Sequence, residues 1–174
     1  ARPQVGISPP AGNFVYFGTG RYFAVGDNGV GTGANTLYAI RDTNEKGATT
    51  LVLPAAGRSA LVEQQVLNEQ VVNFDGNTKG VRVTTNNPIA DDDDGWYLDL
   101  PTSGERQVST PILRGGRIIF TTVIPSGDEC SAGGDSWLLV LDALSGSRLG
   151  SAPFDLNRDY AFDIEDFVRL DPDD

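Results

Sequence analysis

The chain contains no histidine and no methionine, and its 174 residues include one cysteine, Cys130. Without histidine it lacks the commonest catalytic base near neutral pH and the commonest ligand of transition metals. A single cysteine excludes an internal disulfide, so Cys130 is either a small buried apolar residue or has its partner outside this chain. These absences argue against nucleophile–histidine catalysis and against a transition-metal site.

Basic residues are scarce as well: 13 Lys and Arg stand against 24 Asp and Glu, which gives a formal net charge of −11. A negative field repels phosphate groups, so we expect no nucleic acid and no anionic membrane surface among the partners. No apolar run is long enough to span a bilayer. The N-terminal residues show no signal peptide, as expected for a mature secreted chain or for an excised fragment.

Glycine is abundant, with 21 residues, and 10 prolines are spread along the chain. This composition is typical of many short elements joined by tight turns. Apolar β-rich segments occur at 14–20, 35–40, 61–67, 80–85, 95–100, 117–124 and 136–142. We expect an all-β fold in which residues 61–67 form a strand that pairs with the next one across a turn at 74–80, and in which Gly115 and Gly116 form a hairpin turn.

Two parts of the chain repeat one order of features: a strand, a loop, a second strand, an aspartate and a polar turn. The first copy uses strands at 15–17 and 37–40, and the second uses strands at 118–123 and 138–141. The repeat predicts blades of a β-propeller, with a sandwich of antiparallel sheets as the alternative. Since a closed propeller needs at least about four blades of roughly forty residues, two copies indicate a propeller segment.

The second copy ends in LLVLDALSGSRL (138–149), which is similar to the ending of quinoprotein-type propeller blades. Here we expect Asp142 and Ser145 to close the turn by bonds from their side chains to the backbone. Gly146 is expected to take the position with positive φ. This similarity concerns the turn alone, and no quinone site follows from it.

Residues 155–166 alternate oxygen-bearing side chains with other residues. Acidic or amide side chains stand at positions one, three, five, nine and twelve, and position seven offers a backbone carbonyl. Hard oxygens that converge from a short loop are the ligands of Ca²⁺ in EF-hand loops. The predicted calcium ligands are Asp155, Asn157, Asp159, Ala161 (through its carbonyl), Asp163 and Asp166.

Two residues depart from a standard loop of this kind. Tyr160 stands at position six, where the sharp bend normally selects glycine, and Asp166 replaces the usual glutamate at position twelve, as in dockerin-type loops. No helix is expected before the loop, and a short helix after it is predicted by the apolar residues Ile164, Phe167, Val168 and Leu170. The alternative is a solvated acidic connector that binds no ion.

Two further motifs have structural interpretations. The four aspartates at 91–94 predict a charged surface loop, because consecutive side chains on an extended chain point in different directions; a weak cation site is the alternative. The Gly-rich residues 26–35 lack the spacing of a phosphate-binding loop, so we expect an inter-strand loop whose turn is capped by Asp27 and Asn28.

Catalytic groups are hard to find. Without histidine, a nucleophilic serine needs a lysine base, and the two lysines, Lys46 and Lys79, both lie in polar turn segments. Trp96, Tyr97 and Trp137 lie in strand-like segments and are expected to pack within the blades, with no sequence support for a sugar-stacking platform. We therefore expect no enzyme.

Several stretches together resemble one family. They are VYFGTGRYF (15–23), LYAIRD (37–42), RSALVEQ (58–64), RVTTNNPI (82–89), GWYLDLP (95–101) and the long block at 104–149. In this order they are similar to the C-terminal β-propeller domain of PilC/PilY-type proteins, the type IV pilus tip-associated adhesins and assembly factors of Gram-negative bacteria. The resemblance covers residues 3 to about 149.

The resemblance implies a modified seven-bladed propeller of which this chain is the C-terminal part. It also implies a calcium-dependent, surface-exposed protein that supports pilus extension, counteracts retraction and contacts other surfaces. The family's calcium loop of the D-x-D-x-N-x-D type belongs to earlier blades, so none of its residues transfers here. Arg114 with Gly115 and Gly116 is a turn and no Arg-Gly-Asp tripeptide.

We therefore expect residues 1–153 to be the C-terminal blades of a β-propeller and residues 154–174 to be an EF-hand or dockerin-like calcium loop with a short helix. The predicted function is that of a non-enzymatic, extracellular, pilus-associated protein. Its expected partners are pilins or minor pilins, host or abiotic surfaces, and the rest of its own propeller. The alternatives are a carbohydrate-binding or polysaccharide-acting propeller, and a structural scaffold whose acidic loop stays free of ions.

Overall fold

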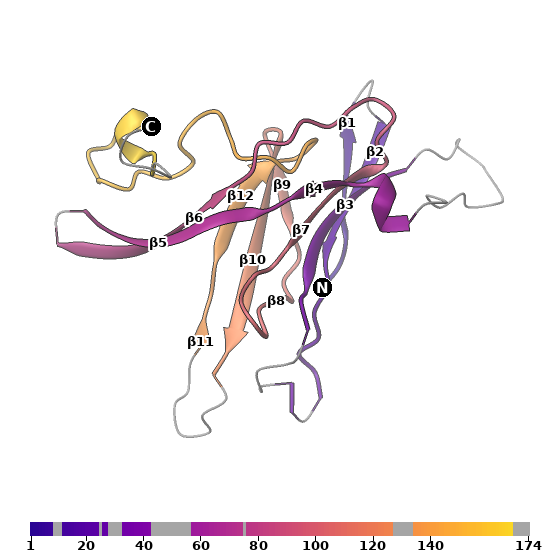
Figure 1. The fold of residues 1–174 in the computed structure, drawn as a ribbon, viewed down its shortest axis with the longest axis horizontal. Helices are drawn as coiled ribbons and strands as arrows, with labels where there is room; N and C mark the ends of the chain where they lie inside the picture. Colours follow the sequence, from indigo (N-terminus) through magenta and orange to yellow (C-terminus); the bar gives the residue numbers. More distant parts are fainter. Residues whose placement is uncertain are drawn as a thin grey trace.

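The structure is a computed structural model that describes residues 1–8, 12–24, 26–27, 33–42, 57–74, 76–126 and 134–168. The described residues contain twelve strands and two short 3-10 helices, so the all-β prediction is confirmed (Figure 1). Cys130 and Asn28 lie outside the described residues. No described helix has the length and apolar character needed to cross a membrane.

The first sheet has the strand order β1-β2-β3-β7-β4. These strands are β1 (Gln4–Ser8), β2 (Gly12–Gly18), β3 (Thr36–Asp42), β7 (Gly95–Asp99) and β4 (Val62–Gln64). All neighbours are antiparallel except β4, which runs parallel to β7. Side chains alternate between the two faces, and the inner face buries Phe14 and Tyr16 of β2, Leu37 and Ala39 of β3, and Trp96 and Leu98 of β7.

The second sheet is built around β10 (Arg117–Pro125). Its neighbours are β8 (Arg106–Gln107), β9 (Ile112–Arg114), β11 (Gly134–Asp135) and β12 (Leu138–Asp142). Because β9 and β12 both pair with the first residues of β10, they lie on opposite edges of that strand. Gly115 and Gly116 join β9 to β10 with φ of 57° and 75°, which confirms the predicted hairpin turn.

The core lies between the inner faces of the two sheets. Trp96 of the first sheet meets Phe120 of the second edge-on, with ring centroids 6.3 Å apart and planes at 84°. Around this contact pack Ile118, Leu139 and Leu141. The two copies of the sequence repeat therefore form matching antiparallel hairpins, β2–β3 and β10–β12, which contribute to one core.

The turn after β12 has the predicted form. The Asp142 carboxylate accepts hydrogen bonds from the backbone N–H groups of Leu144 and Ser145, both at 2.9 Å, and from the Ser145 hydroxyl at 3.0 Å. Gly146 has φ of 70°, and a Cβ there would lie 2.2 Å from the Trp96 ring. Glycine is required both by the backbone and by the close approach of the indole.

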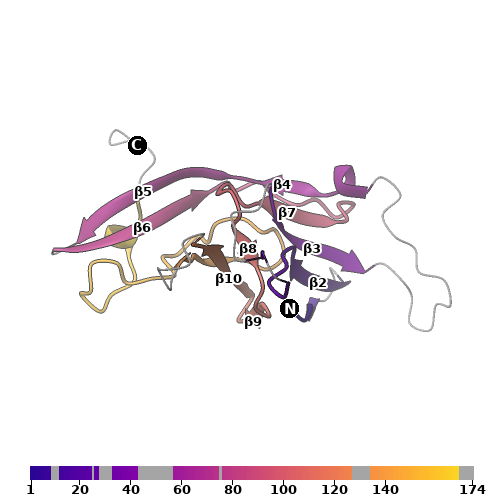
Figure 2. The same cartoon turned by 90° about the horizontal axis from the view of Figure 1, so that it is seen from below.

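A third element, the arm, is the antiparallel hairpin of β5 (Val66–Phe74) and β6 (Asn77–Thr84). Figures 1 and 2 show it as a long curved ribbon that extends beyond the two sheets, with the C-terminal segment in yellow running beside it. The prediction of one strand at 61–67 is wrong, because the chain leaves the first sheet at Gln65 and β5 begins at Val66. The buried Gln64 amide fixes this point by donating to Asn87 O and Ser145 O.

The predicted pairing of this region with the next strand is confirmed for β5 and β6, although the turn between them is shorter than 74–80. The short helix predicted from Ile164, Phe167, Val168 and Leu170 is present only as a single 3-10 turn, η2 (Ile164–Asp166), and the backbone is extended at Phe167. Leu170 lies outside the described residues. The other 3-10 helix, η1 (Gly57–Ala60), precedes β4.

Candidate metal loop and its support

The predicted calcium loop forms a compact series of turns beside the arm. The Asp155 carboxylate accepts hydrogen bonds from two backbone N–H groups, that of Arg158 at 2.6 Å and that of Tyr160 at 3.1 Å. Asp159 accepts from Ala161 N at 2.7 Å. Residues at positions one and five of the loop therefore turn their oxygens inward, toward the backbone of the loop.

Asp166, at position twelve, joins the end of the loop to its start. Its Oδ1 accepts from the backbone N–H groups of Leu156, at 2.5 Å, and Asn157, at 3.3 Å. Its Oδ2 accepts from Asp163 N at 3.3 Å, and only 5% of the residue is exposed. At the start of η2, Asp163 accepts from Glu165 N at 2.9 Å in a capping box with Asp166, and the turn ends at Phe167, where the backbone is extended.

The bend expected at position six is present without glycine. Tyr160 has φ of 70° and Arg158, at position four, has φ of 67°; among the described residues these are the non-glycine residues with positive φ. A non-glycine residue in this region carries strain of about 1–3 kcal/mol. The Tyr160 side chain is 93% exposed, so its ring contributes almost no packing that offsets this strain. The sequence predicts a bend with positive φ at position six, but it does not indicate the second positive φ, at position four.

The donor set is made of oxygens alone, which suits Ca²⁺ and excludes a soft transition-metal site. The loop supplies the Asp155, Asn157, Asp159, Asp163 and Asp166 side chains and the Ala161 carbonyl, all within one closed turn. Among the described residues, no three acidic side chains are gathered closely enough to hold a metal ion. Binding an ion therefore requires the carboxylates, which now cap backbone N–H groups, to move together.

Lys79 links the loop to the arm. It lies on β6, and its Nζ donates a hydrogen bond of 3.1 Å to the carbonyl oxygen of Leu156, at position two of the loop. The sequence placed this lysine in a polar turn and gave no indication of the contact, which joins residues 77 positions apart.

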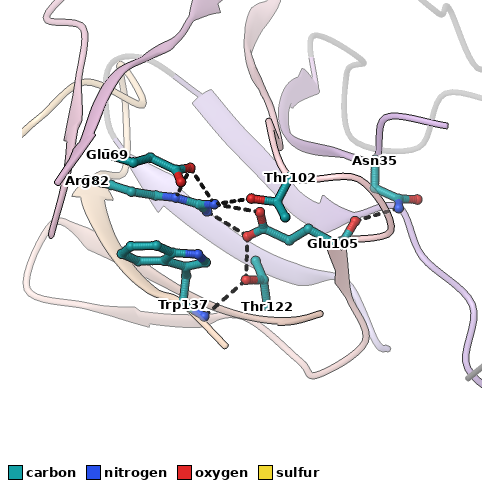
Figure 3. A network of polar contacts seen from close by, with 7 residues as sticks. All are labelled: Asn35, Glu69, Arg82, Thr102, Glu105, Thr122 and Trp137. Carbon is teal, nitrogen blue, oxygen red and sulfur yellow. Dashed lines mark hydrogen bonds and ion pairs between the residues drawn. The ribbon is translucent and has the colours of Figure 1, made fainter. Parts of the chain in front are cut away.

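The base of the arm is held by a buried ion pair (Figure 3). The Arg82 guanidinium on β6 donates to both carboxylate oxygens of Glu105, at 2.6 and 2.7 Å, and to the Thr102 hydroxyl at 3.0 Å. The side chains of Arg82 and Glu105 are 3% and 0% exposed. Glu69 of β5 completes the set at the rim, with 2.7 Å between its carboxylate and Arg82 and an exposed fraction of 38%.

Glu105 connects this pair to the second sheet. Its Oε1 accepts from the hydroxyl of Thr122 on β10 at 2.6 Å, and its backbone carbonyl accepts from the Asn35 amide at 2.6 Å. The Arg82 guanidinium carbon also lies 4.1 Å above the centre of the Trp137 ring. The arm, the second sheet and the residue before β12 thus meet at this ion pair, and Asn35, the residue before β3, bonds to the Glu105 backbone.

The other predicted sites have structural roles. Asp93 in the 91–94 run accepts from Ala90 N at 2.6 Å, so this acid caps its own surface turn. Trp96 is fully buried and Trp137 packs beneath Arg82, which confirms both as packing residues.

Asp27 caps its turn as predicted. Its carboxylate accepts from Ala24 N at 2.7 Å and from Phe23 N at 2.8 Å, and it pairs with Arg21 at 3.1 Å. These hydrogen bonds, led by that from Ala24, lower the pKa of Asp27 from 3.8 to about 2.

No protein-family model matches the sequence. A curated protein named type IV pilus biogenesis factor PilY1 homolog, from Xylella fastidiosa, is 38% identical over 150 residues, covering 82% of this chain. The type IV pilus biogenesis factor PilY1 of Pseudomonas aeruginosa strain PAO1 is 31% identical over 159 residues, covering 84% of this chain. The chain spans only 9% and 14% of the length of these two relatives.

Among solved structures, the crystal structure of the Pseudomonas aeruginosa PilY1 C-terminal domain has a TM-score of 0.78 to this fold and 28% sequence identity. The match covers 92% of this chain and 34% of that one. It confirms the expectation of a β-propeller-like fold of the kind found in that domain.

Proposed function

The chain is homologous to the C-terminal part of PilY1-type type IV pilus biogenesis factors, and we propose that it is a calcium-stabilised, non-enzymatic part of such a factor at the cell surface. The relatives are named as biogenesis factors and not as enzymes, which agrees with the absence of histidine from the chain. In the longer protein it would contribute to pilus assembly, to opposing retraction and to contacts with pilins or with host or abiotic surfaces.

In the proposed calcium site, the ion is held by the side chains of Asp155, Asn157, Asp159, Asp163 and Asp166 and by the Ala161 carbonyl. The observation that carries this part of the proposal is the closed form of the loop. Asp166 bonds to the N–H groups at positions two and three, and Tyr160 makes the bend at position six in spite of its side chain. Calcium coordination gives a physical reason to retain that strain.

The proposed role of the ion is structural: it would hold the loop, and through it the arm, in one geometry. Because Lys79 of the arm donates to Leu156 within the loop, a loop held in one geometry also fixes one side of the arm. Calcium would thereby stabilise the arrangement of arm and second sheet, and with it the surface that the longer protein presents.

Isothermal titration with calcium tests the site. We expect one binding event for the wild type and none for Asp155→Ala/Asp159→Ala. The matched control is Asp91→Ala/Asp92→Ala, which removes the same charge from another acidic segment and should bind like the wild type. Equal and negligible heats for the wild type and the loop variant would exclude the calcium site.

The pilus role needs a separate test in a piliated bacterium. Deleting this chain from the longer protein is expected to reduce the number of surface pili, counted by electron microscopy. An unchanged number would refute the pilus role and leave the calcium measurement unaffected.

A further inference from the structure

Exposed apolar side chains are concentrated in the C-terminal loop, although it is one of the most acidic parts of the chain. Tyr160 is 93% exposed, Phe162 62% and Ile164 70%, and these residues follow one another at alternate positions. Elsewhere in the described residues, large exposed apolar side chains occur singly or in pairs. Scattered residues of that kind are normal on a protein surface, whereas a group of them marks a site of interaction.

The loop itself does not explain why residue 160 is a tyrosine. Tyr160 has φ of 70°, a conformation that strains tyrosine and that glycine adopts freely. A calcium loop needs the bend, but the glycine that EF-hand loops carry at this position would make it without strain. A tyrosine that is strained and packs against almost nothing in its own chain therefore indicates a contact with another molecule.

An exposed carboxylate adjoins each member of the group. These acids are Asp159 before Tyr160, Asp163 after Phe162, and Glu165 after Ile164. Residues 155–166 contain five acids and one arginine, so their net charge is 1 − 5 = −4, and a bound calcium ion would leave it at −4 + 2 = −2. Such a field repels an anionic membrane surface and attracts a surface that carries lysine or arginine.

We propose that Tyr160, Phe162 and Ile164 are a docking surface for a separate protein whose contact segment carries lysine or arginine beside apolar side chains. Tyrosine is among the residues that contribute most to binding at interfaces, because its large ring loses little conformational entropy on contact. The face of the ring also attracts a guanidinium or ammonium group. The acids beside the ring supply the complementary charge.

Hydrogen bonds within the loop hold Tyr160 in place before any contact is made. The Asp155 carboxylate accepts from Tyr160 N at 3.1 Å, and Asp159 accepts from Ala161 N at 2.7 Å. A surface that is already ordered loses less entropy when a partner binds. Because these bonds need neither calcium nor a pilus, the docking surface and the proposed function can fail independently.

Photo-crosslinking in the longer protein, produced in a piliated bacterium, tests the docking surface. Tyr160 is replaced by the photoreactive amino acid p-benzoylphenylalanine, and the matched control carries the same group at Val71, which is 72% exposed on the arm. Cross-linked peptides are identified by mass spectrometry. We expect position 160 to form an adduct with one other protein, through a peptide that has lysine or arginine beside apolar residues, and position 71 to form at least about fivefold less of it.

The cross-linked peptide, made synthetically, is then the probe for binding to the purified longer protein. We expect Tyr160→Gly, which relieves strain and leaves the charge unchanged, to weaken binding at least about tenfold. Glu165→Lys, which reverses a charge outside the proposed calcium ligands, should weaken binding about fivefold. Asp92→Lys reverses an exposed charge in another acidic segment and should bind like the wild type.

Several results would overturn the proposal. They are no adduct at position 160, an adduct within the longer protein itself, an adduct with lipid, and an adduct through a peptide without basic residues. Equal binding of the peptide by the wild type and Tyr160→Gly would show that the ring is not the contact. Equal binding by the wild type and Glu165→Lys would show that the acids do not select the partner, and would overturn it as well.

Discussion

Replacing Arg82 by alanine should be among the most destabilising single changes in the chain. The variant leaves the Glu105 carboxylate fully buried with the Thr122 hydroxyl as its remaining side-chain donor. Removing one partner from a buried ion pair costs about 3–5 kcal/mol, because the other charge stays desolvated and unpaired. Loss of the contact with the Trp137 ring adds roughly 0.5–1 kcal/mol. We expect the free energy of unfolding to fall by about 4 kcal/mol.

Two variants separate the effect of the buried ion pair on stability from the effect of removing charge from the region. Glu69→Ala removes a contact of the same guanidinium at the 38%-exposed rim, and should cost only about 0–1 kcal/mol. Arg82→Met/Glu105→Gln removes both charges while retaining most of the volume, and should be less destabilising than Arg82→Ala alone.

The assay is denaturation by urea at neutral pH, followed by fluorescence. Trp137 beneath Arg82 reports on the base of the arm, and Trp96 in the core reports on the two sheets. Because the emission of the two tryptophans overlaps, a single transition of the summed fluorescence is expected if the arm and the sheets unfold together. If Arg82→Ala costs no more than Glu69→Ala, the ion pair does not hold the arm, and the reasoning is refuted.

Three further predictions use single positions. Tyr160→Gly should raise the free energy of unfolding by about 1 kcal/mol in chemical denaturation, since relief of positive-φ strain outweighs the greater entropy of the unfolded chain; a decrease would contradict the strained turn. Gly146→Ala should lower the melting temperature far more than Gly76→Ala: both glycines have positive φ, but only the first faces the Trp96 ring at 2.2 Å, and equal effects would count against this packing. Because the folded pKa of Asp27 is lowered from 3.8 to about 2, its stabilising effect is present above pH 4 and is lost as the pH falls toward 2. The difference in unfolding free energy between wild type and Asp27→Asn should shrink over that range, and a constant difference would argue against the shift.

The features that the sequence predicted well are local. Paired strands, the turn of Gly115 and Gly116, and the cap of Asp142 depend on residues within a few positions of one another, and the backbone confirms them. The strain at Tyr160 was also visible from its position in the loop, because the bend there requires positive φ.

The missed features depend on contacts between distant residues. Nothing in the sequence pairs Arg82 with Glu105, yet they meet across 23 positions in a fully buried site. Strand β4, which pairs in parallel with β7, ends at Gln64. The side-chain amide of Gln64 donates to the carbonyl oxygen of Ser145, 81 positions away. Propensity and periodicity carry no information about such partners, so they predict one strand at 61–67 where the structure has the end of β4 and the start of β5.

In the proposed calcium site the loop carboxylates would have two roles, and these roles determine how the protein should respond to changing calcium. Asp155 and Asp166 cap backbone N–H groups of the loop, and they would have to move toward the other carboxylates to coordinate the ion. A loop that has these internal bonds does not collapse when calcium is scarce, and Lys79 can keep its contact with Leu156. We therefore expect falling calcium to loosen this part of the protein gradually, as a change of stiffness, while the protein remains folded and ready to bind the ion again.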